Sequence, residues 1–392
     1  MPMPDAHSLA PASAAARFLE CTPSLMLEKQ FPNTSSEYAK EGTVAHSLGE
    51  IIAKYKLNQI ITKAYEELKC ELIRSEDGQK FYCKEMEDHA TEYADLILDH
   101  LEKARENCPD AFAELEVKSD YSEWIPGGWG TSDCVIISDD TLEIIDLKYG
   151  KGHRVDPEGN PQLRLYALGA YQKYKALFDI EYVRMTIYQP RLGHVASDTI
   201  LLSELLGWAE QYVKPRAALA LKGEGEFNPN EETCRFCKAK GQCRARANKN
   251  LSLFDQAPDL PLISIDEAGE ILSKAGDIKK WLEDLESVVT GSLLNGKAVE
   301  GWKLVAGKSN RTIKDDIKAV ELLKAAGVDE VLLYNKKLIT LTEMEKNFGK
   351  KFVAETLAEC IVKPEGKPTL APASDKRDAL NIQEAVIKAF DE

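Results

Sequence analysis

The stretch Thr141-Leu-Glu-Ile-Ile-Asp146-Leu-Lys148-Tyr149-Gly150 contains the strand on which the predicted fold depends. Its apolar residues indicate a buried strand, and successive side chains of a strand point to opposite faces. Asp146 and Lys148 therefore project together, while the side chain of Leu147 faces the core. A carboxylate that can hold a metal ion, beside a lysine, is the arrangement that hydrolysis of a phosphodiester needs. An exposed ion pair at the end of a strand is the alternative.

The composition is that of a globular protein with a sizeable core. The chain has 392 residues, of which 44% are hydrophobic and 29% charged, and this length predicts two or three domains. No apolar run is long enough to cross a bilayer, and the first residues lack the parts of a signal peptide. We therefore expect a cytoplasmic protein without a membrane partner, in a compartment where disulfides are rare.

The net charge of −15 argues against a general nucleic-acid coat, because nonspecific binding depends on neutralising phosphates. It leaves room for an enzyme that grips DNA in one local basic groove. No Gly-x-x-x-x-Gly-Lys-Ser/Thr loop for ATP is present, which excludes a helicase motor.

Hydrophobic periodicity predicts an α/β fold with a mixed sheet flanked by helices. Helices are expected at residues 12–20, 43–55 and 162–177 and over most of 60–106, and strands at 113–118, 130–138, 141–149 and 181–189. This domain is expected to span residues 1–250. Residues 251–263, which contain two prolines, are expected to be a linker. Residues 264–392 are expected to form a smaller C-terminal α+β domain with no assigned role.

A tight turn at Asp139-Asp140 would join two of these strands as a hairpin. Asp133 and Asp146 are equally far from the centre of that turn. They are therefore expected to be cross-strand neighbours, close enough to share a cation. Two solvated aspartates at strand ends are the alternative.

Two helices offer further polar side chains. In Gly42-Thr-Val-Ala-His46-Ser-Leu-Gly-Glu50, His46 and Glu50 lie one turn apart on one face. A histidine beside two carboxylates would be a metal ligand, at a site that suits Mg²⁺ or Mn²⁺. Gln162 and Tyr166 are also four residues apart, where they could bind phosphate oxygens or brace the site. A structural histidine and a tyrosine that packs on the sheet are the alternatives.

These motifs occur in one order along the chain: Gly-Thr-x-x-His46-x-x-x-Glu50, Gly130-x-x-Asp133, Asp146-x-Lys148 and Gln162-x-x-x-Tyr166. In this order and spacing, residues 9–245 resemble the PD-(D/E)XK nuclease superfamily, specifically its RecB-like branch. The resemblance implies a restriction-endonuclease-like sheet and an enzyme that acts on DNA.

The resemblance also implies a role for each matching residue. His46, Asp133 and Asp146 would bind the metal, Lys148 would position or activate the attacking water, and the Gln162/Tyr166 pair would support the site and contact DNA. The backbone carbonyl of Leu147, between the two functional residues, is a candidate additional ligand. Glu116, on the preceding strand, is a looser match for a further acidic residue.

Nine cysteines in a chain expected to be cytoplasmic require an explanation other than disulfides. Cys234, Cys237 and Cys243 have the spacing of metal ligands, and a four-ligand site needs one more residue, for which Cys21 is the best candidate. One cysteine before the nuclease core and three after it resemble the AddB and CRISPR-associated exonuclease type, in which they hold a [4Fe–4S] cluster. Zinc is the rival at these cysteines, and unliganded thiols are the third alternative.

The resemblance thus implies a divalent-metal-dependent deoxyribonuclease, with an exonuclease preferred. The layout also resembles an uncharacterised bacteriophage and prophage group of RecB-like proteins. That group implies phage replication or recombination in the bacterial host cytoplasm, beside a single-strand annealing or other recombination protein. A catalytically weak DNA-binding accessory protein and a zinc-stabilised scaffold are the alternatives. The choice between exonuclease and endonuclease, the polarity, the strand preference and the oligomeric state stay open.

Overall fold

The computed structural model describes residues 8–32, 36–252 and 264–305, with five separate positions beyond them at 342, 345, 349, 351 and 354. The chain divides into two compact units, Met1–Asn295 and Gly296–Glu392. Most of the expected linker and most of the expected C-terminal α+β domain lie outside the described residues. The described part of 264–295 belongs to the first unit, so the boundary falls near Asn295 and not at the expected linker.

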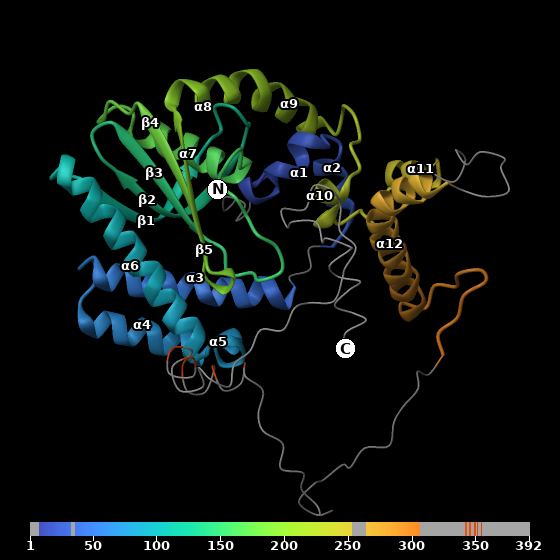
Figure 1. The fold of residues 1–392 in the computed structure, drawn as a ribbon, viewed down its shortest axis with the longest axis horizontal. Helices are drawn as coiled ribbons and strands as arrows, with labels where there is room; N and C mark the ends of the chain where they lie inside the picture. Colours follow the sequence, from blue (N-terminus) through green and yellow to red (C-terminus); the bar gives the residue numbers. More distant parts are fainter. Residues whose placement is uncertain are drawn as a thin grey trace, which may run out of the picture. The chain divides into compact units, whose positions relative to one another are not determined.

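A five-stranded mixed sheet forms the core of the first unit (Figure 1). Its strands follow one another in chain order: β1 (Phe112–Asp120), β2 (Trp129–Ile137), β3 (Thr141–Leu147), β4 (Tyr182–Gln189) and β5 (His194–Leu201). Neighbouring strands are antiparallel except β3 and β4, which are parallel and are joined through helix α7 (Pro161–Tyr174). This mixed sheet with flanking helices confirms the predicted α/β fold.

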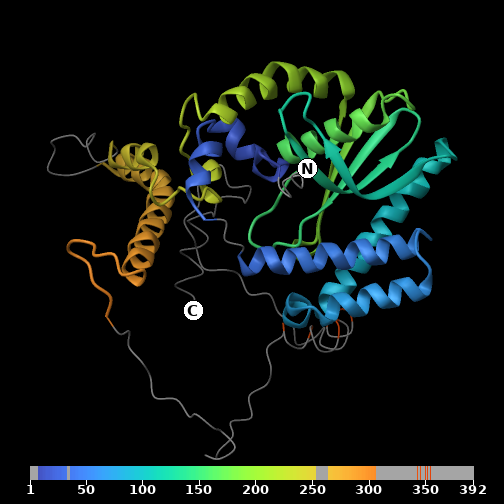
Figure 2. The same cartoon turned by 180° about the vertical axis from the view of Figure 1, so that it is seen from behind.

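Helices cover both faces of the sheet (Figures 1 and 2). One face carries α7 with α1 (Ala15–Glu20), α8 (Leu202–Trp208) and α9 (Lys214–Lys222), and the other carries α3 (Glu37–Lys56) and α6 (Lys84–Asn107). The remaining helices are α2 (Ser24–Leu27), α4 (Thr62–Arg74), α5 (Glu76–Phe81), α10 (Glu231–Arg235), α11 (Arg244–Ser252) and α12 (Ile265–Leu294), and four short turns lie at Ala12–Ala14, Glu28–Gln30, Pro190–Leu192 and Ala209–Val213. Among the described helices, none is long and apolar enough to cross a membrane.

Two apolar cores explain why β3 has apolar residues on both of its faces. Its alternate side chains enter different cores: Leu142 and Ile144 pack on the α7 side, and Ile145 and Leu147 pack on the α3–α6 side. A strand buried on both faces has no polar face to show to water. A charged side chain in such a strand, as at Asp146, is therefore costly unless it has a partner.

The start of α7 is fixed by its cap. The side chain of Asn160 accepts hydrogen bonds from the backbone N–H groups of Gln162 at 3.0 Å and Leu163 at 3.3 Å. Pro161 occupies the first turn, where its missing N–H costs nothing. This cap places Gln162 in the first turn of the helix, beside the end of β3.

Gly169 allows α7 to approach β1 closely. A Cβ at Gly169 would lie 2.5 Å from the backbone carbon of Ser119, which cannot move out of the way. We predict that Gly169→Ala lowers the free energy of unfolding by about 1–3 kcal/mol through overpacking, measured by urea denaturation. Gly207→Ala, on α8 with nothing within 4 Å of its Cβ position, is the matched control. Equal stability of the two variants would contradict this account of the contact.

Candidate functional site

The hairpin of β2 and β3 brings Asp133 and Asp146 together. The ladder between these strands pairs Cys134 with Ile145 and ends there, although both strands continue. Extended by one residue, its register places Asp133 opposite Asp146. Beyond the ladder, the Asp133 side chain accepts a hydrogen bond from the Leu147 N–H at 2.8 Å. The two carboxylates therefore lie side by side where the two strands stop pairing.

Lys148 lies between the Asp146 carboxylate and α7. Its ammonium is 2.8 Å from Oδ2 of Asp146, a buried residue with 2% exposure. This contact is an ion pair without hydrogen-bond geometry, and Oδ2 has no hydrogen-bond partner among the described residues. Lys148 donates instead to Oε1 of Gln162 at 2.9 Å, and Gln162 donates to the Tyr166 hydroxyl at 3.0 Å. The predicted Gln/Tyr pair thus lies behind the lysine.

His46 reaches the same carboxylates from α3. Its Nδ1 lies 3.1 Å from Oδ1 of Asp133. Burial alone would lower the pKa of His46, but the Asp133 charge and hydrogen bond raise that pKa to about 8. Burial would raise the pKa of Asp133, and the charge of His46 holds it below its usual range. For Asp146, burial wins over the attraction of Lys148 and raises the pKa.

Glu116 extends the acidic pair into a row across three strands. The pairs Leu115–Cys134 and Val117–Ser132 flank it, so the register places Glu116 beside Asp133. Its backbone is left-handed, with a φ of +52°, which costs a residue other than glycine about 1–2 kcal/mol. Partial desolvation by the groups around it, then the nearby Asp133 charge, raise the pKa of its carboxyl to about 7. Local strain of this kind occurs often at functional sites.

Tyr93, on α6, is a residue that the sequence analysis missed. It is buried, and its hydroxyl has no hydrogen-bond partner among the described residues. Burial and then the charge of Asp133 raise its pKa well above the usual range. A Cβ at Gly49 would lie 3.0 Å from its ring, so Gly49 gives the ring its place beside the site.

The chemistry of these residues fits a divalent cation. As they stand, no three His, Cys, Asp or Glu side chains in the described part of the chain are arranged to hold a metal ion. The carboxylates are neutralised instead by protein cations, His46 on Asp133 and Lys148 on Asp146. Carboxylate oxygens with one imidazole are nonetheless the donors that Mg²⁺ and Mn²⁺ take. Oδ2 of Asp146 is a buried acceptor with unused capacity, and the side chain of Leu147 is buried away from it in the core.

The four predicted cysteines line one small pocket. Cys21 follows α1, Cys234 lies on α10, and Cys237 and Cys243 lie on the loop after it, around a cavity of about 10 Å³. No disulfide joins the described cysteines. Burial raises the pKa of Cys21, Cys234 and Cys237, the last to about 12. As they stand, these thiols do not form a metal-holding group in the described part of the chain, but cysteines around one pocket are the donors that a cation would bind as thiolates.

Other contacts join the N-terminal helices α1 and α2 to the segment that contains the three later cysteines. The Thr22 hydroxyl donates to the Glu224 carbonyl at 2.7 Å. Glu28 pairs with Arg17 at 2.8 Å and accepts the Lys238 N–H at 2.7 Å. The N-terminal helices are therefore attached to the cysteine segment by direct hydrogen bonds and an ion-paired glutamate, in addition to the shared cysteine pocket.

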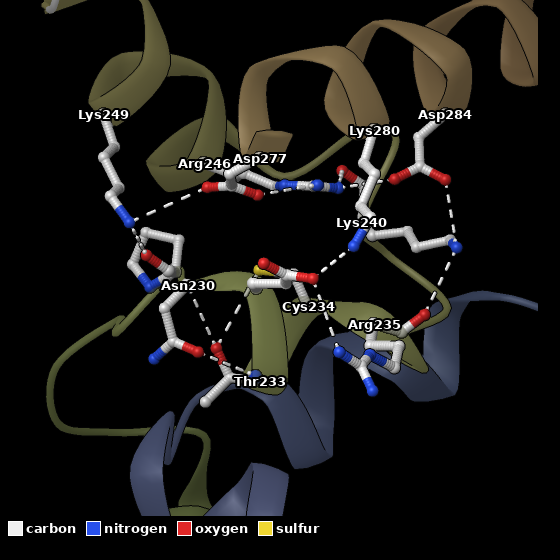
Figure 3. A network of polar contacts seen from close by, with 12 residues as sticks. Asn230, Thr233, Cys234, Arg235, Lys240, Arg246, Lys249, Asp277, Lys280 and Asp284 are labelled. Atoms are coloured by element: carbon white, nitrogen blue, oxygen red, sulfur yellow. Dashed lines mark hydrogen bonds and ion pairs between the residues drawn. The ribbon is translucent and has the colours of Figure 1, made fainter. Parts of the chain in front are cut away.

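A buried arginine attaches α12 to the cysteine segment (Figure 3). Arg246 is 3% exposed and pairs with Asp284 at 2.6 Å and Asp277 at 3.2 Å. Lys240 also pairs with Asp284 at 3.0 Å. A Cβ at Gly241 would lie 2.9 Å from the Asp284 carbonyl. These contacts explain why α12 belongs to the first unit.

The fold and site define an α/β protein with a carboxylate–lysine pair at the end of a hairpin and four cysteines around one pocket. The chain belongs to the family described as "Protein of unknown function (DUF2800)", which matches residues 7–378. It is also similar to a solved structure described as "Crystal structure of SSO0001", with 16% identity, 50% of this chain and 85% of that chain covered, and a TM-score of 0.22. A likeness of that size carries no argument about fold or function.

The His46–Asp133 pair predicts a pH dependence of stability in the metal-free protein. The pKa of His46 is raised from 6.5 to about 8 on folding, so its contribution is fully present below pH 6.5 and is lost as the pH rises through 8. Urea denaturation in EDTA should show that the stability difference between the wild type and His46→Gln shrinks over this interval. A difference that is constant with pH would contradict the ion pair. The Glu116 carboxyl changes the stability over a lower pH interval than His46, because its pKa rises only to about 7.

Proposed function

We propose that this protein is a divalent-metal-dependent deoxyribonuclease. The observation that carries the proposal is the contact of Lys148 with buried Asp146, next to Asp133 on the adjoining strand. The order and spacing of the motifs resemble the RecB-like branch of the PD-(D/E)XK nucleases, which supports the same conclusion. Exonuclease action, and a role in phage replication or recombination beside another recombination protein, follow from the resemblance alone.

His46, Asp133 and Asp146, with the carbonyl of Leu147, would hold the cation. When bound, Mg²⁺ or Mn²⁺ supplies a Lewis acid that offsets negative charge developing on the phosphoryl group. His46, which now pairs with Asp133 as an imidazolium, would lose its proton to become a ligand.

Lys148 would orient the attacking water or offset charge on the phosphate. Its hydrogen bond to Gln162, and that of Gln162 to Tyr166, fix where the ammonium lies. Gln162 is half-buried and Tyr166 is buried with 8% exposure. We therefore assign them as positioning residues that act through Lys148.

We propose a [4Fe–4S] cluster at Cys21, Cys234, Cys237 and Cys243, with zinc as the rival. The support is that these residues, and no other described cysteine, line the same small pocket. Cross-links that close long loops remove the most entropy from the unfolded chain in principle. A structural role that joins the two ends of the domain follows, without electron transfer.

Nuclease activity is tested with end-labelled single- and double-stranded DNA in Mg²⁺, Mn²⁺ or EDTA. We predict cleavage that needs the metal and that falls by about 10²-fold or more in Lys148→Ala, as for loss of a group that assists proton transfer. Lys63→Ala, whose side chain is 80% exposed on α4, is the control and should keep full activity. Activity that survives both EDTA and Lys148→Ala would disprove this mechanism, and mononucleotide products would identify an exonuclease.

The cysteine proposal is tested by colour, metal content and melting temperature. Protein purified anaerobically should be brown and contain iron and sulfide, and Cys237→Ser should bleach it and lower the Tm. Cys70→Ser, at an exposed cysteine on α4, is the control and should change neither. A colourless wild-type protein that contains zinc would show that zinc, and not a [4Fe–4S] cluster, occupies the four cysteines.

A further inference from the structure

A cleft of about 890 Å³ begins at the candidate catalytic residues and reaches the cysteine segment. One wall comes from α3 and the loop after β3, with Tyr38, His46, Lys148 and Lys151. The opposite wall comes from α10, the loop that follows it, and α12. Because α12 lies beyond the residues that carry the nuclease motifs, nothing in those motifs predicts this second wall.

Helix α12, which forms part of the second wall, is attached to the cysteine segment by several contacts. Buried Arg246 pairs with two aspartates of α12, and Glu231 pairs with Lys280 of α12 and with Arg235 of α10. Gly241 touches the backbone of α12 so closely that a Cβ would clash there. The cleft therefore has two defined sides in the first unit.

The lining is positive in a negative chain. It contains seven lysines and arginines against five acidic residues, while the whole chain carries a net charge of −15. Four of those acids pair with bases of the same lining, as Glu41 does with Arg191 at 2.9 Å, so the excess is the difference between the two counts. Lys151 is exposed and has no ion-pair partner among the described residues. A local excess of positive charge attracts a polyanion even to an acidic protein.

Two aromatic side chains stand exposed on the cleft. Phe236 is 75% exposed and Tyr38 is 80% exposed. Phe236 lies between Cys234 and Cys237, so the cysteine pocket holds its loop in place. Exposed aromatic rings in a positive groove are platforms on which unpaired bases stack. Bases inside a duplex are already stacked and offer no free face.

We propose that this cleft binds an unpaired strand of nucleic acid, with Phe236 stacked on a base and Lys151, Arg235 and Lys280 on phosphates. The proposal rests on the proposed nuclease function and gives that site its substrate class, a single-stranded segment delivered to Lys148. The second wall is then part of substrate recognition, although it carries no catalytic residue.

Binding is measured by fluorescence anisotropy in EDTA, so that no cleavage occurs. The probes are fluorescein-labelled oligothymidylate, oligouridylate of the same length, which separates DNA from RNA, and a blunt-ended duplex. We expect oligothymidylate to bind more tightly than the duplex, and Phe236→Ala to weaken it roughly tenfold. Phe236→Trp should retain binding. Tyr182→Ala, at an exposed aromatic on β4 outside the cleft, is the control and should bind like the wild type.

Lys151→Gln gives a second test that does not touch the cysteine loop. Loss of one phosphate contact should reduce the slope of log affinity against log salt by about 0.7 for a single strand. Equal binding of duplex and single strand, or unchanged binding by both Phe236→Ala and Lys151→Gln, would overturn the cleft proposal. Phe236-dependent binding without any cleavage would support the cleft and reject the nuclease. Cleavage that is unchanged in both Phe236→Ala and Lys151→Gln would support the nuclease and reject the cleft.

Discussion

Two carboxylates held at the end of one β-ladder repel each other, and the site consists largely of groups that offset this repulsion. Asp133 receives a backbone N–H and a histidine, and Asp146 receives a lysine. Like charges at this distance push their pKa values apart, and here Asp133 keeps the ionised form more easily than Asp146. Without the lysine, Asp146 would be a buried charge without a cationic partner on its own strand.

The same constraint explains why residues from two strands and two helices lie together here. The strands stop pairing at Cys134 and Ile145, so α3 reaches the carboxylates from one face of the sheet and α7 from the other. The cap at Asn160 sets where α7 begins and thereby where Gln162 lies. Glu116 and Tyr93 then add one further acid and one buried hydroxyl without a partner. The candidate centre is thus a product of hairpin register and helix start.

Much of this arrangement could be predicted from the sequence, because it depends on the spacing of apolar residues and on the number of residues between each aspartate and the turn. The apolar alternation located β1 to β4, and equal distances from Asp139-Asp140 predicted the register of Asp133 and Asp146. Strand β5 was missed, because Ser197, Asp198 and Thr199 interrupt its apolar residues. Helices α8 and α9 were not predicted either. Tyr93 has no local signal, since its place depends on how α6 packs across Gly49. The docking of α12 has none either, because it depends on ion pairs between residues far apart in the sequence, chiefly those of buried Arg246.

The separation in sequence of the N-terminal helices and the cysteine segment has a consequence for synthesis on the ribosome. Thr22 and its partner Glu224 are 202 residues apart. At about 5–20 residues per second, the first segment emerges roughly 10–40 seconds before the second. During that interval, apolar residues of α1 such as Phe18 and Leu19, buried in the finished protein, lack part of their cover. The newly made chain therefore has a period in which chaperones or premature aggregation can act on its N-terminus.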